Sequence, residues 1–168
     1  FAGDNPLLVA LVMLSIVTLL FTTIGGLGAK AGKKMGKVTV DDAAICIGQA
    51  IRQALGDKSG IRRFGHAYIP MDETLSRCAL DLSNRPYLIW NVEFRTPKVG
   101  DMDTELFKEF HHAFAMNSGA CVHLETLYGD NTHHIAESGF KALARALRAA
   151  VEIDPKAGGQ AVSTKGVL

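Results

Sequence analysis

A short histidine-rich motif carries the strongest chemical signal in the sequence, and it reads His133-His134-Ile135-Ala136-Glu137. On a helix, His133 and Glu137 share one face because they are four positions apart, whereas His134 is turned away by about 100°. Neutral imidazole together with carboxylate suits Mn, Fe, Ni or Zn. The motif therefore predicts a metal site that uses His133, His134 and Glu137. The alternative is a solvated helix start in which the glutamate only complements the helix dipole.

A second group of residues is suited to binding an anion. The run Ser163-Thr164-Lys165-Gly166 combines two hydroxyls, an ammonium group and a glycine that allows close backbone approach. The same run also fits an ordinary polar tail, and the basic residues Arg63, Arg85 and Lys141 are each explained by surface charge. The sequence contains no nucleophile elbow, Walker loop or dinucleotide fingerprint.

These residues have to be positioned by alternating helices and strands. Apolar spacing predicts helices over residues 41–55, 104–116 and 133–153, and we expect His111 and His112 on the solvated face of the second helix. Runs rich in β-branched and aromatic residues predict strands over residues 62–69, 74–82, 87–94 and 121–128. Within the second strand, the more apolar face consists of Ser76, Cys78, Leu80 and Leu82. The pattern indicates an α+β fold with helices on one face of a sheet.

Two of the predicted helices match each other when the chain is shifted by about 96 positions. Arg52 then falls on Arg148, and Ile51 falls on Leu147. The match indicates an internal duplication, and the alternative is a chance match between two helices rich in Ala and Arg.

Composition divides the chain into two unlike parts. Asp4 is the only charged residue before Lys30, although charged residues make up 21% of the whole sequence. Residues 5–29 would extend about 37 Å as a helix, which is enough to cross a bilayer, so we expect a transmembrane helix at about residues 6–29. A cleaved signal peptide and a buried helix of a soluble protein are weaker alternatives.

The residues after this apolar stretch and the overall charge limit the setting of the protein. Four lysines follow the stretch and favour a cytoplasmic location for the rest of the chain: Lys30, Lys33, Lys34 and Lys37. The three cysteines form no paired motif, which favours a reducing compartment. A net charge of +1 gives no general attraction to nucleic acid.

Six blocks stand in a fixed order along the chain: GDKSGIRRFG, PMDETL, LDLSNRPYL, VGDMDTELF, GDNTHHIAESGFKALARALRAA and STKG. Together they resemble the imidazoleglycerol-phosphate dehydratases of histidine biosynthesis, and the resemblance covers residues 39–168. It implies an α+β fold made of a duplicated half-domain, each half a four-stranded sheet with helices on one face. It also implies a homo-oligomer, a 24-subunit particle in the family.

The resemblance further implies a cytoplasmic hydro-lyase that converts imidazoleglycerol phosphate to imidazoleacetol phosphate. The family holds two manganese ions (Mn2+) with histidines and carboxylates from both halves and from neighbouring subunits, and the matching ligands here are His133, His134 and Glu137. The residues that match the family's substrate and phosphate contacts are Arg63, Arg85, Lys141, Ser163, Thr164 and Lys165.

The first half departs from the family pattern. Lys37-Val38 stands where the family has two histidine ligands, and neither side chain binds manganese near neutral pH. Asp41 takes the place of a glutamate ligand, and Glu109 occupies a position where many members have a ligand histidine. We therefore expect residues 1–38 to be a non-family segment and residues 39–168 to be a dehydratase domain with a truncated first half.

Three hypotheses about function remain open. In the first hypothesis, the chain is an active dehydratase. In the second, it is a catalytically impaired or non-catalytic member of the family, tethered to a membrane and able to donate half a site to an intact neighbour. In the third hypothesis, residues 1–38 are foreign to the natural protein, which is an ordinary soluble enzyme.

Overall fold

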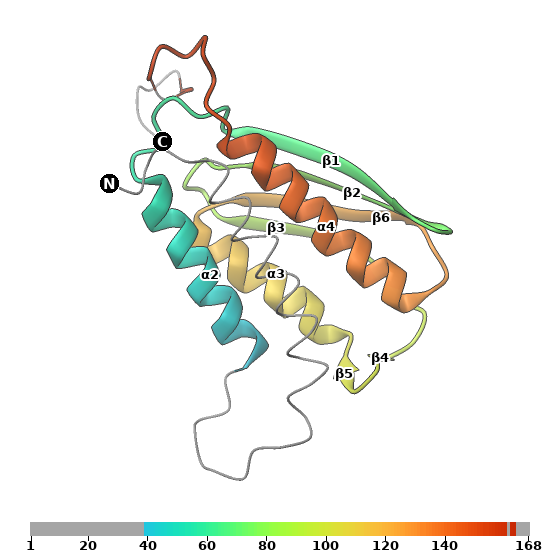
Figure 1. Cartoon of the computed structure of the whole chain (residues 1–168). Coiled ribbons are helices and arrows are strands. Elements are labelled where there is room, and N and C mark those ends of the chain that lie inside the picture. Colours follow the sequence, from blue (N-terminus) through green and yellow to red (C-terminus); the bar gives the residue numbers. More distant parts are fainter. Residues whose placement is uncertain (1–38, 161, 164–168) are drawn as a thin grey trace.

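The computed structural model describes residues 39–160, 162 and 163. In this part of the chain, three helices lie on one side of a mixed four-stranded sheet, as Figure 1 shows. The sequence-predicted transmembrane helix at residues 6–29, and the segment 1–38 to which it belongs, lie outside the described residues. Among the helices of the described residues, none combines the length and apolarity needed to span a bilayer.

Each of the three helices begins or ends at a residue suited to that place. Helix α2 (Val40–Leu55) starts after Thr39, whose hydroxyl accepts from the amide of Asp42 while the Asp42 carboxylate accepts from the amide of Thr39. Helix α3 (Glu105–Ser118) ends at Gly119, where φ is +73°, a value that glycine adopts without strain. The third helix is α4 (Thr132–Val151), capped by the side chain of Asn131.

The main sheet has the strand order β1-β2-β6-β3. Its strands are β1 (Phe64–Met71), β2 (Thr74–Asp81), β3 (Tyr87–Asn91) and β6 (Cys121–Tyr128). The pairs β1–β2 and β2–β6 are antiparallel, whereas β3 and β6 run parallel. A separate two-stranded sheet pairs β4 (Lys98–Val99) with β5 (Met102–Asp103). All four predicted strands are present, and the third is shorter than predicted.

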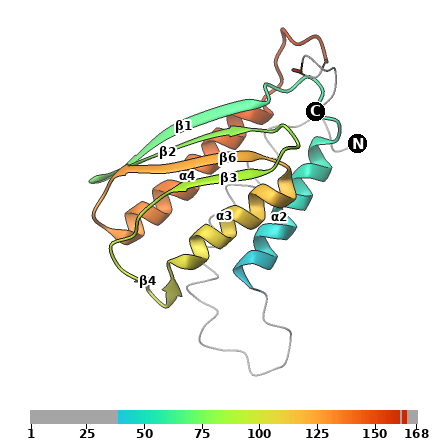
Figure 2. The same ribbon diagram turned by 180° about the vertical axis from the view of Figure 1, so that it is seen from behind.

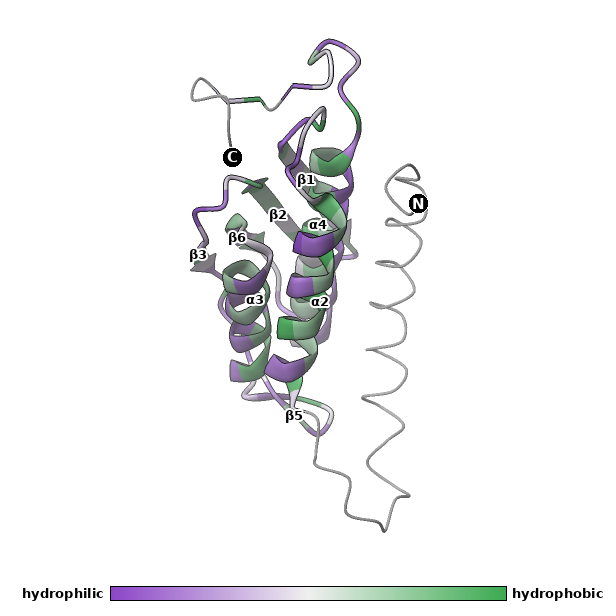
Figure 3. Cartoon of the chain, turned by 90° about the vertical axis from the view of Figure 1, so that its left-hand side faces the viewer, coloured by the Kyte–Doolittle hydropathy of each residue, from purple (hydrophilic) through white to green (hydrophobic). Residues whose placement is uncertain are grey.

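The core lies between the main sheet and the helices. Strand β2 turns Ser76, Cys78 and Leu80 into this layer, which confirms the more apolar face that its sequence predicts. Phenylalanines of α3 and leucines of α4 fill the space above the sheet: Phe107, Phe110, Phe114, Leu143 and Leu147. The helices carry hydrophilic and hydrophobic residues in alternation along their length, as Figure 3 shows.

Helix α3 also buries one residue that the sequence places in solvent. His112 is exposed as expected, but His111 is only 1% exposed and lies among aromatic side chains. Its ring contacts Trp90 at 5.0 Å and Phe140 at 4.6 Å between centroids. The expectation of a solvated His111-His112 pair is therefore wrong for His111, because this helix turns that position toward the sheet.

Helix α4 runs along β1 and β2 and connects two distant ends of the domain. It begins beside the turn between β1 and β2, and it ends near the start of β1, as Figures 1 and 2 show from opposite sides. The helix approaches β1 closely because Gly65 has no side chain: a Cβ there would lie 1.9 Å from the carbonyl oxygen of Ala146. At the far end, the amide of Arg63 donates to the carbonyl of Ala150 at 2.9 Å.

Candidate functional site

The predicted metal-binding histidines lie in the first turn of α4. The Asn131 side chain caps this turn and accepts from the backbone amides of His133 and His134 at 2.9 and 3.3 Å. Because the cap fixes the helix start, the two imidazoles leave the backbone in defined and different directions, and their ring planes are 62° apart. We call this region, with the adjacent β1–β2 turn, the histidine end.

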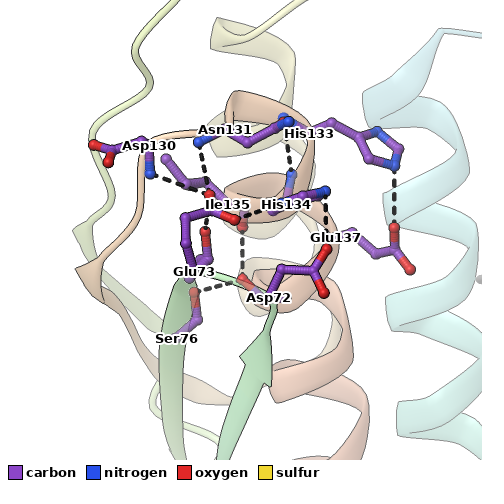
Figure 4. A network of polar contacts seen from close by, with 11 residues as sticks. Asp72, Glu73, Ser76, Asp130, Asn131, His133, His134, Ile135 and Glu137 are labelled. Atoms are coloured by element: carbon purple, nitrogen blue, oxygen red, sulfur yellow. Dashed lines mark hydrogen bonds and ion pairs between the residues drawn. The ribbon is translucent and has the colours of Figure 1, made fainter.

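His134 points at the turn between β1 and β2. Its Nδ1 lies 2.8 Å from Oε2 of Glu73, and its Nε2 lies 3.6 Å from Oδ2 of Asp72 (Figure 4). Glu73 also accepts from the backbone amides of Asp130 and Asn131, at 3.3 and 2.8 Å. The turn and the loop before α4 are thus joined through one carboxylate.

Glu137 lies on the other face of this turn of α4. Its Oε2 is 3.1 Å from Nε2 of His133, and its Oε1 is 2.7 Å from Nζ of Lys141. The structure therefore places Lys141, a predicted phosphate contact, at the histidine end and pairs it with a predicted metal ligand. The row His133, Glu137 and Lys141 follows one helix face at four-residue spacing.

The remaining described phosphate contacts meet at the opposite end of α4, which we call the arginine end. Arg63 donates from Nε and Nη2 to both oxygens of Asp81, at 2.6 and 3.0 Å, and from Nη1 to the carbonyl of Val162 at 2.6 Å. These bonds hold Ser163, the residue after Val162, near Arg63. Arg85 lies 3.9 Å from Asp81 and its side chain is 73% exposed. Predicted contacts Thr164 and Lys165 lie outside the described residues.

One backbone angle and one buried side chain characterise the arginine end. Arg63 has φ of +69°, in the left-handed region that a non-glycine residue rarely adopts. Lys58 is 1% exposed and donates from Nζ to the carbonyl of Leu82 and to Oδ1 of Asn84, at 3.0 and 2.9 Å. It therefore pins the turn that carries Arg85. Burial lowers the pKa of the Lys58 ammonium below its usual value.

Among the described residues of one chain, the two ends do not meet. His134 and Ala150 both belong to α4, and at 1.5 Å per residue they are about 24 Å apart along the helix axis. The structure thus brings together Arg63, Arg85 and Ser163 at one end. At the other end it brings together His133, His134, Glu137 and Lys141.

The described part of one chain does not by itself assemble a metal site. Asp41 is exposed in the first turn of α2, and Glu109 is exposed on α3. Among residues 39–160, 162 and 163, no group of three or more His, Cys, Asp or Glu side chains is arranged to hold a metal ion. Imidazole and carboxylate are suitable donors for a divalent cation such as Mn2+, so the donor chemistry fits, but the described residues of a single chain supply too few converging donors.

Sequence reasoning missed three acidic residues that organise the two ends. Asp72 and Glu73 form the turn facing His134, and Asp81 lies between the two arginines. All three lie in the sequence blocks PMDETL and LDLSNRPYL. The family resemblance of these blocks was therefore the sequence feature that could have identified them. Their roles depend on long-range pairing of β1, β2 and α4, which local residue spacing does not reveal.

Comparison with known proteins settles the family. The family model for imidazoleglycerol-phosphate dehydratase matches residues 24–147, which is more than half of the chain. The chain belongs to the imidazoleglycerol-phosphate dehydratase family.

Relatives named imidazoleglycerol-phosphate dehydratase are similar to this chain over most of its length. The protein from Phenylobacterium zucineum is 80% identical over 130 residues, and that from Magnetococcus marinus is 63% identical over 130 residues. In both cases the alignment covers 77% of this chain and 66% of the relative. The chain thus spans just under two thirds of the length of these curated relatives.

Solved dehydratase structures share the fold. The enzyme from Staphylococcus aureus is 43% identical with a TM-score of 0.67, and the alignment covers 68% of each chain. The enzyme from Pyrococcus furiosus, solved in complex with (S)-C348, is 34% identical with a TM-score of 0.71. That second alignment covers 96% of this chain and 86% of the other.

Proposed function

We propose that this chain is a subunit of an imidazoleglycerol-phosphate dehydratase, a hydro-lyase that converts D-erythro-imidazoleglycerol phosphate to imidazoleacetol phosphate in histidine biosynthesis. The observation that carries the proposal is 80% identity over 130 residues with a protein of that name. The residues at the two ends of α4 support it, because an imidazole–carboxylate group and an arginine group suit the two ends of such a substrate.

The arginine end binds the phosphate in this proposal. Arg85 is largely exposed and only loosely paired with Asp81, so its guanidinium is the donor that is open to a dianion. Arg63 is 12% exposed and already donates to Asp81 and Val162, so it holds the following Ser163 at the same end of α4 as Arg85. Thr164 and Lys165 are the further phosphate contacts that the family resemblance implies. A phosphate held remotely in this way orients the reacting end of the substrate.

The histidine end carries the chemistry. His133, His134 and Glu137 are the metal ligands, with Asp41 and Glu109 as further carboxylates from the first half and from α3. A bound divalent ion, Mn2+ as the family resemblance implies, supplies Lewis-acid stabilisation of the negative charge that develops as water is lost. To reach the ion, Glu137 has to exchange its contacts with His133 and Lys141, and Lys141 is then released toward substrate.

Assembly is part of the same proposal. The substrate is only about 7 Å from imidazole to phosphate, counted as single bonds of about 1.5 Å. The two ends of one chain are about 24 Å apart along α4, so a complete site has to combine ends from different copies. We therefore infer a homo-oligomer in the cytoplasm, with 24 subunits if it follows the family resemblance.

The domain organisation also remains a proposal. Residues 39–168 form the dehydratase domain, in which α2 belongs to a truncated first half and the four-stranded sheet with α4 to a complete second half. Residues 1–38 are a separate segment in this proposal, although the match to the family model already begins at residue 24. The alternative is a catalytically impaired member. It is favoured by Lys37-Val38 at the positions of two family ligands and by the absence of a three-donor group among the described residues of one chain.

A comparison of two purified chains tests both functions. The given chain and the double variant Lys37→His, Val38→His are loaded with Mn2+, and formation of imidazoleacetol phosphate is measured. Activity in both chains supports the dehydratase, and activity in the double variant alone supports the impaired member. Absence of product from both chains would contradict the proposed activity.

A further inference from the structure

The turn between β1 and β2 contributes a carboxylate that has no role in the function proposed above. Glu73 receives four hydrogen bonds, three of them at Oε1: from the hydroxyl of Thr74 at 2.9 Å and from the amides of Asp130 and Asn131 at 3.3 and 2.8 Å. The fourth involves Oε2, which lies 2.8 Å from Nδ1 of His134 (Figure 4). One carboxylate therefore spans from a fixed backbone segment to a ring nitrogen.

Glu73 is ionised in this arrangement. The hydroxyl of Thr74 and the amides of Asp130 and Asn131 all donate to Oε1, and three donors at one oxygen favour the charged form of the carboxyl. An ionised carboxylate accepts hydrogen bonds and donates none. The hydrogen between Oε2 and Nδ1 is therefore carried by the imidazole.

A neutral imidazole with hydrogen on Nδ1 has its lone pair on Nε2. In His134 this nitrogen faces Oδ2 of Asp72 at 3.6 Å, and the His134 side chain is 22% exposed. The Nε2 lone pair of His134 and Oδ2 of Asp72 are then two neighbouring electron donors, and such a pair favours a cation between them. The contact with Glu73 thus decides which nitrogen of the ring is available.

We propose that Glu73 is a positioning residue that fixes the Nδ1–H tautomer of His134 and thereby presents the Nε2 lone pair of that ring to a divalent cation. Carboxylates that receive the second N–H of a ligand histidine fix ring orientation and raise ligand basicity in many metal sites. The assignment of the Nδ1–H tautomer depends only on the hydrogen bonds of Glu73, whereas the binding of a cation at Nε2 rests on the proposed function.

The variant Glu73→Gln separates positioning from folding. Its carbonyl oxygen can still accept from the amides of Asp130 and Asn131, so the turn stays attached to the loop before α4. Its amide nitrogen then faces Nδ1 of His134 and donates to it, which moves the ring hydrogen to Nε2. Glu125→Gln is the matched control, because Glu125 is comparably exposed and receives a hydrogen bond from Arg77 at 2.7 Å on the opposite face of the sheet.

The experiment measures tautomers and metal binding on the full chain. Protein labelled with 15N-histidine is studied by long-range 1H–15N NMR near neutral pH without metal, and His134→Gln identifies the signals of His134. We expect the Nδ1–H tautomer in the wild-type chain and in Glu125→Gln, and the Nε2–H tautomer in Glu73→Gln. With Mn2+ alone as the probe, we expect Glu73→Gln to bind about 10–100-fold more weakly, with no change in Glu125→Gln.

The outcomes separate this role from the proposed function. An Nε2–H or doubly protonated His134 in the wild-type chain would overturn the role of Glu73, whether or not any variant folds. Unchanged tautomer and Mn2+ affinity in folded Glu73→Gln would do the same. A wild-type chain that binds no Mn2+ would overturn the metal site, while the NMR comparison would still decide what Glu73 does to the ring.

Discussion

The imidazole of His111 lies in an aromatic cluster with one nitrogen paired and the other not. Its Nδ1 is 2.6 Å from the carbonyl oxygen of Phe107, whereas Nε2 has no hydrogen-bond partner among the described residues. Burial lowers the pKa of His111 from 6.5 to about 4. The ring is therefore neutral when folded, and its protonation opposes folding.

His111 makes stability depend on pH. Because the folded-state pKa of about 4 lies below the unfolded value of 6.5, the unfolded chain binds more protons between these pH values. The contribution of neutral His111 to the free energy of unfolding is complete above pH 6.5. It is lost as the pH falls toward 4 and amounts to about 3 kcal/mol. His111→Phe removes this contribution, so its free energy of unfolding should fall less between pH 7 and 4. Urea unfolding of both chains at a series of pH values measures the difference, and parallel pH profiles would contradict the prediction.

Lys58 provides a second prediction at the scale of a residue. Lys58→Met leaves the carbonyl of Leu82 and the side chain of Asn84 without their ammonium donor inside the protein. We expect a loss of about 1–3 kcal/mol in the free energy of unfolding, since unpaired buried acceptors carry that cost. Inorganic phosphate should also bind more weakly, because the turn that carries Arg85 is no longer pinned. Titration calorimetry with phosphate checks this, with Lys156→Met, an exposed lysine near the end of the described chain, as the control.

Residue spacing was a partial guide to these side chains. His133 and Glu137 were placed on one helix face, and the structure has them 3.1 Å apart. The burial of His111 could not be predicted in the same way. Neighbouring residues on a helix point about 100° apart, so one of two adjacent histidines can be buried while the other is exposed. The pairing of Arg63 with Asp81 joins residues that no local pattern connects.

At the scale of elements, the position of α4 on the sheet decides where both ends of the site lie. The helix approaches β1 so closely at Gly65 that any side chain there would meet the backbone of Ala146. Two residues before Gly65, the amide of Arg63 donates to the carbonyl of Ala150 and attaches the start of β1 to the end of α4. Helix α4 therefore acts as a fixed spacer between the histidine end and the arginine end.

Two glycine substitutions with opposite expected effects test this spacer. Gly65→Ala should lower the free energy of unfolding by about 3 kcal/mol, because the new Cβ lies 1.9 Å from a backbone oxygen that cannot move independently. Gly139→Ala, within α4, adds a Cβ only to within 3.5 Å of Leu124 and should raise the free energy of unfolding by up to about 1 kcal/mol. Thermal or urea unfolding decides, and equal effects of the two substitutions would contradict the close contact.

The existence and type of the three helices and of the four main-sheet strands could be predicted from sequence, whereas the short strands β4 and β5 and the neighbours of each element could not. Apolar spacing placed α2, α3 and α4 within a few residues of their observed bounds, since each helix has one buried face. The strand order, with β6 between β2 and β3, follows from long-range packing. For that reason the β1–β2 turn was not expected beside His134.

At the scale of the whole molecule, the separation of the two ends predicts complementation between inactive chains. His134→Ala removes the histidine end, and Arg85→Ala removes the arginine end. If each site combines ends from different copies, each variant alone is inactive, whereas subunits mixed in equal amounts regain up to about a quarter of the intact sites. Dehydratase activity after unfolding and refolding the variants together measures this. Mixing of each variant with itself is the control, and inactive mixtures would place a complete site within one copy.

The length of α4 between the two ends also has a thermodynamic consequence. A compact ligand that engages both an arginine end and a histidine end has to connect two copies of the chain, so binding and association are linked equilibria. Dilution of the protein then weakens the apparent affinity for such a ligand, and the ligand in turn strengthens association between subunits. An inhibitor that contacts both ends would hold two subunits together, and its potency would depend on the concentration of the protein that it inhibits.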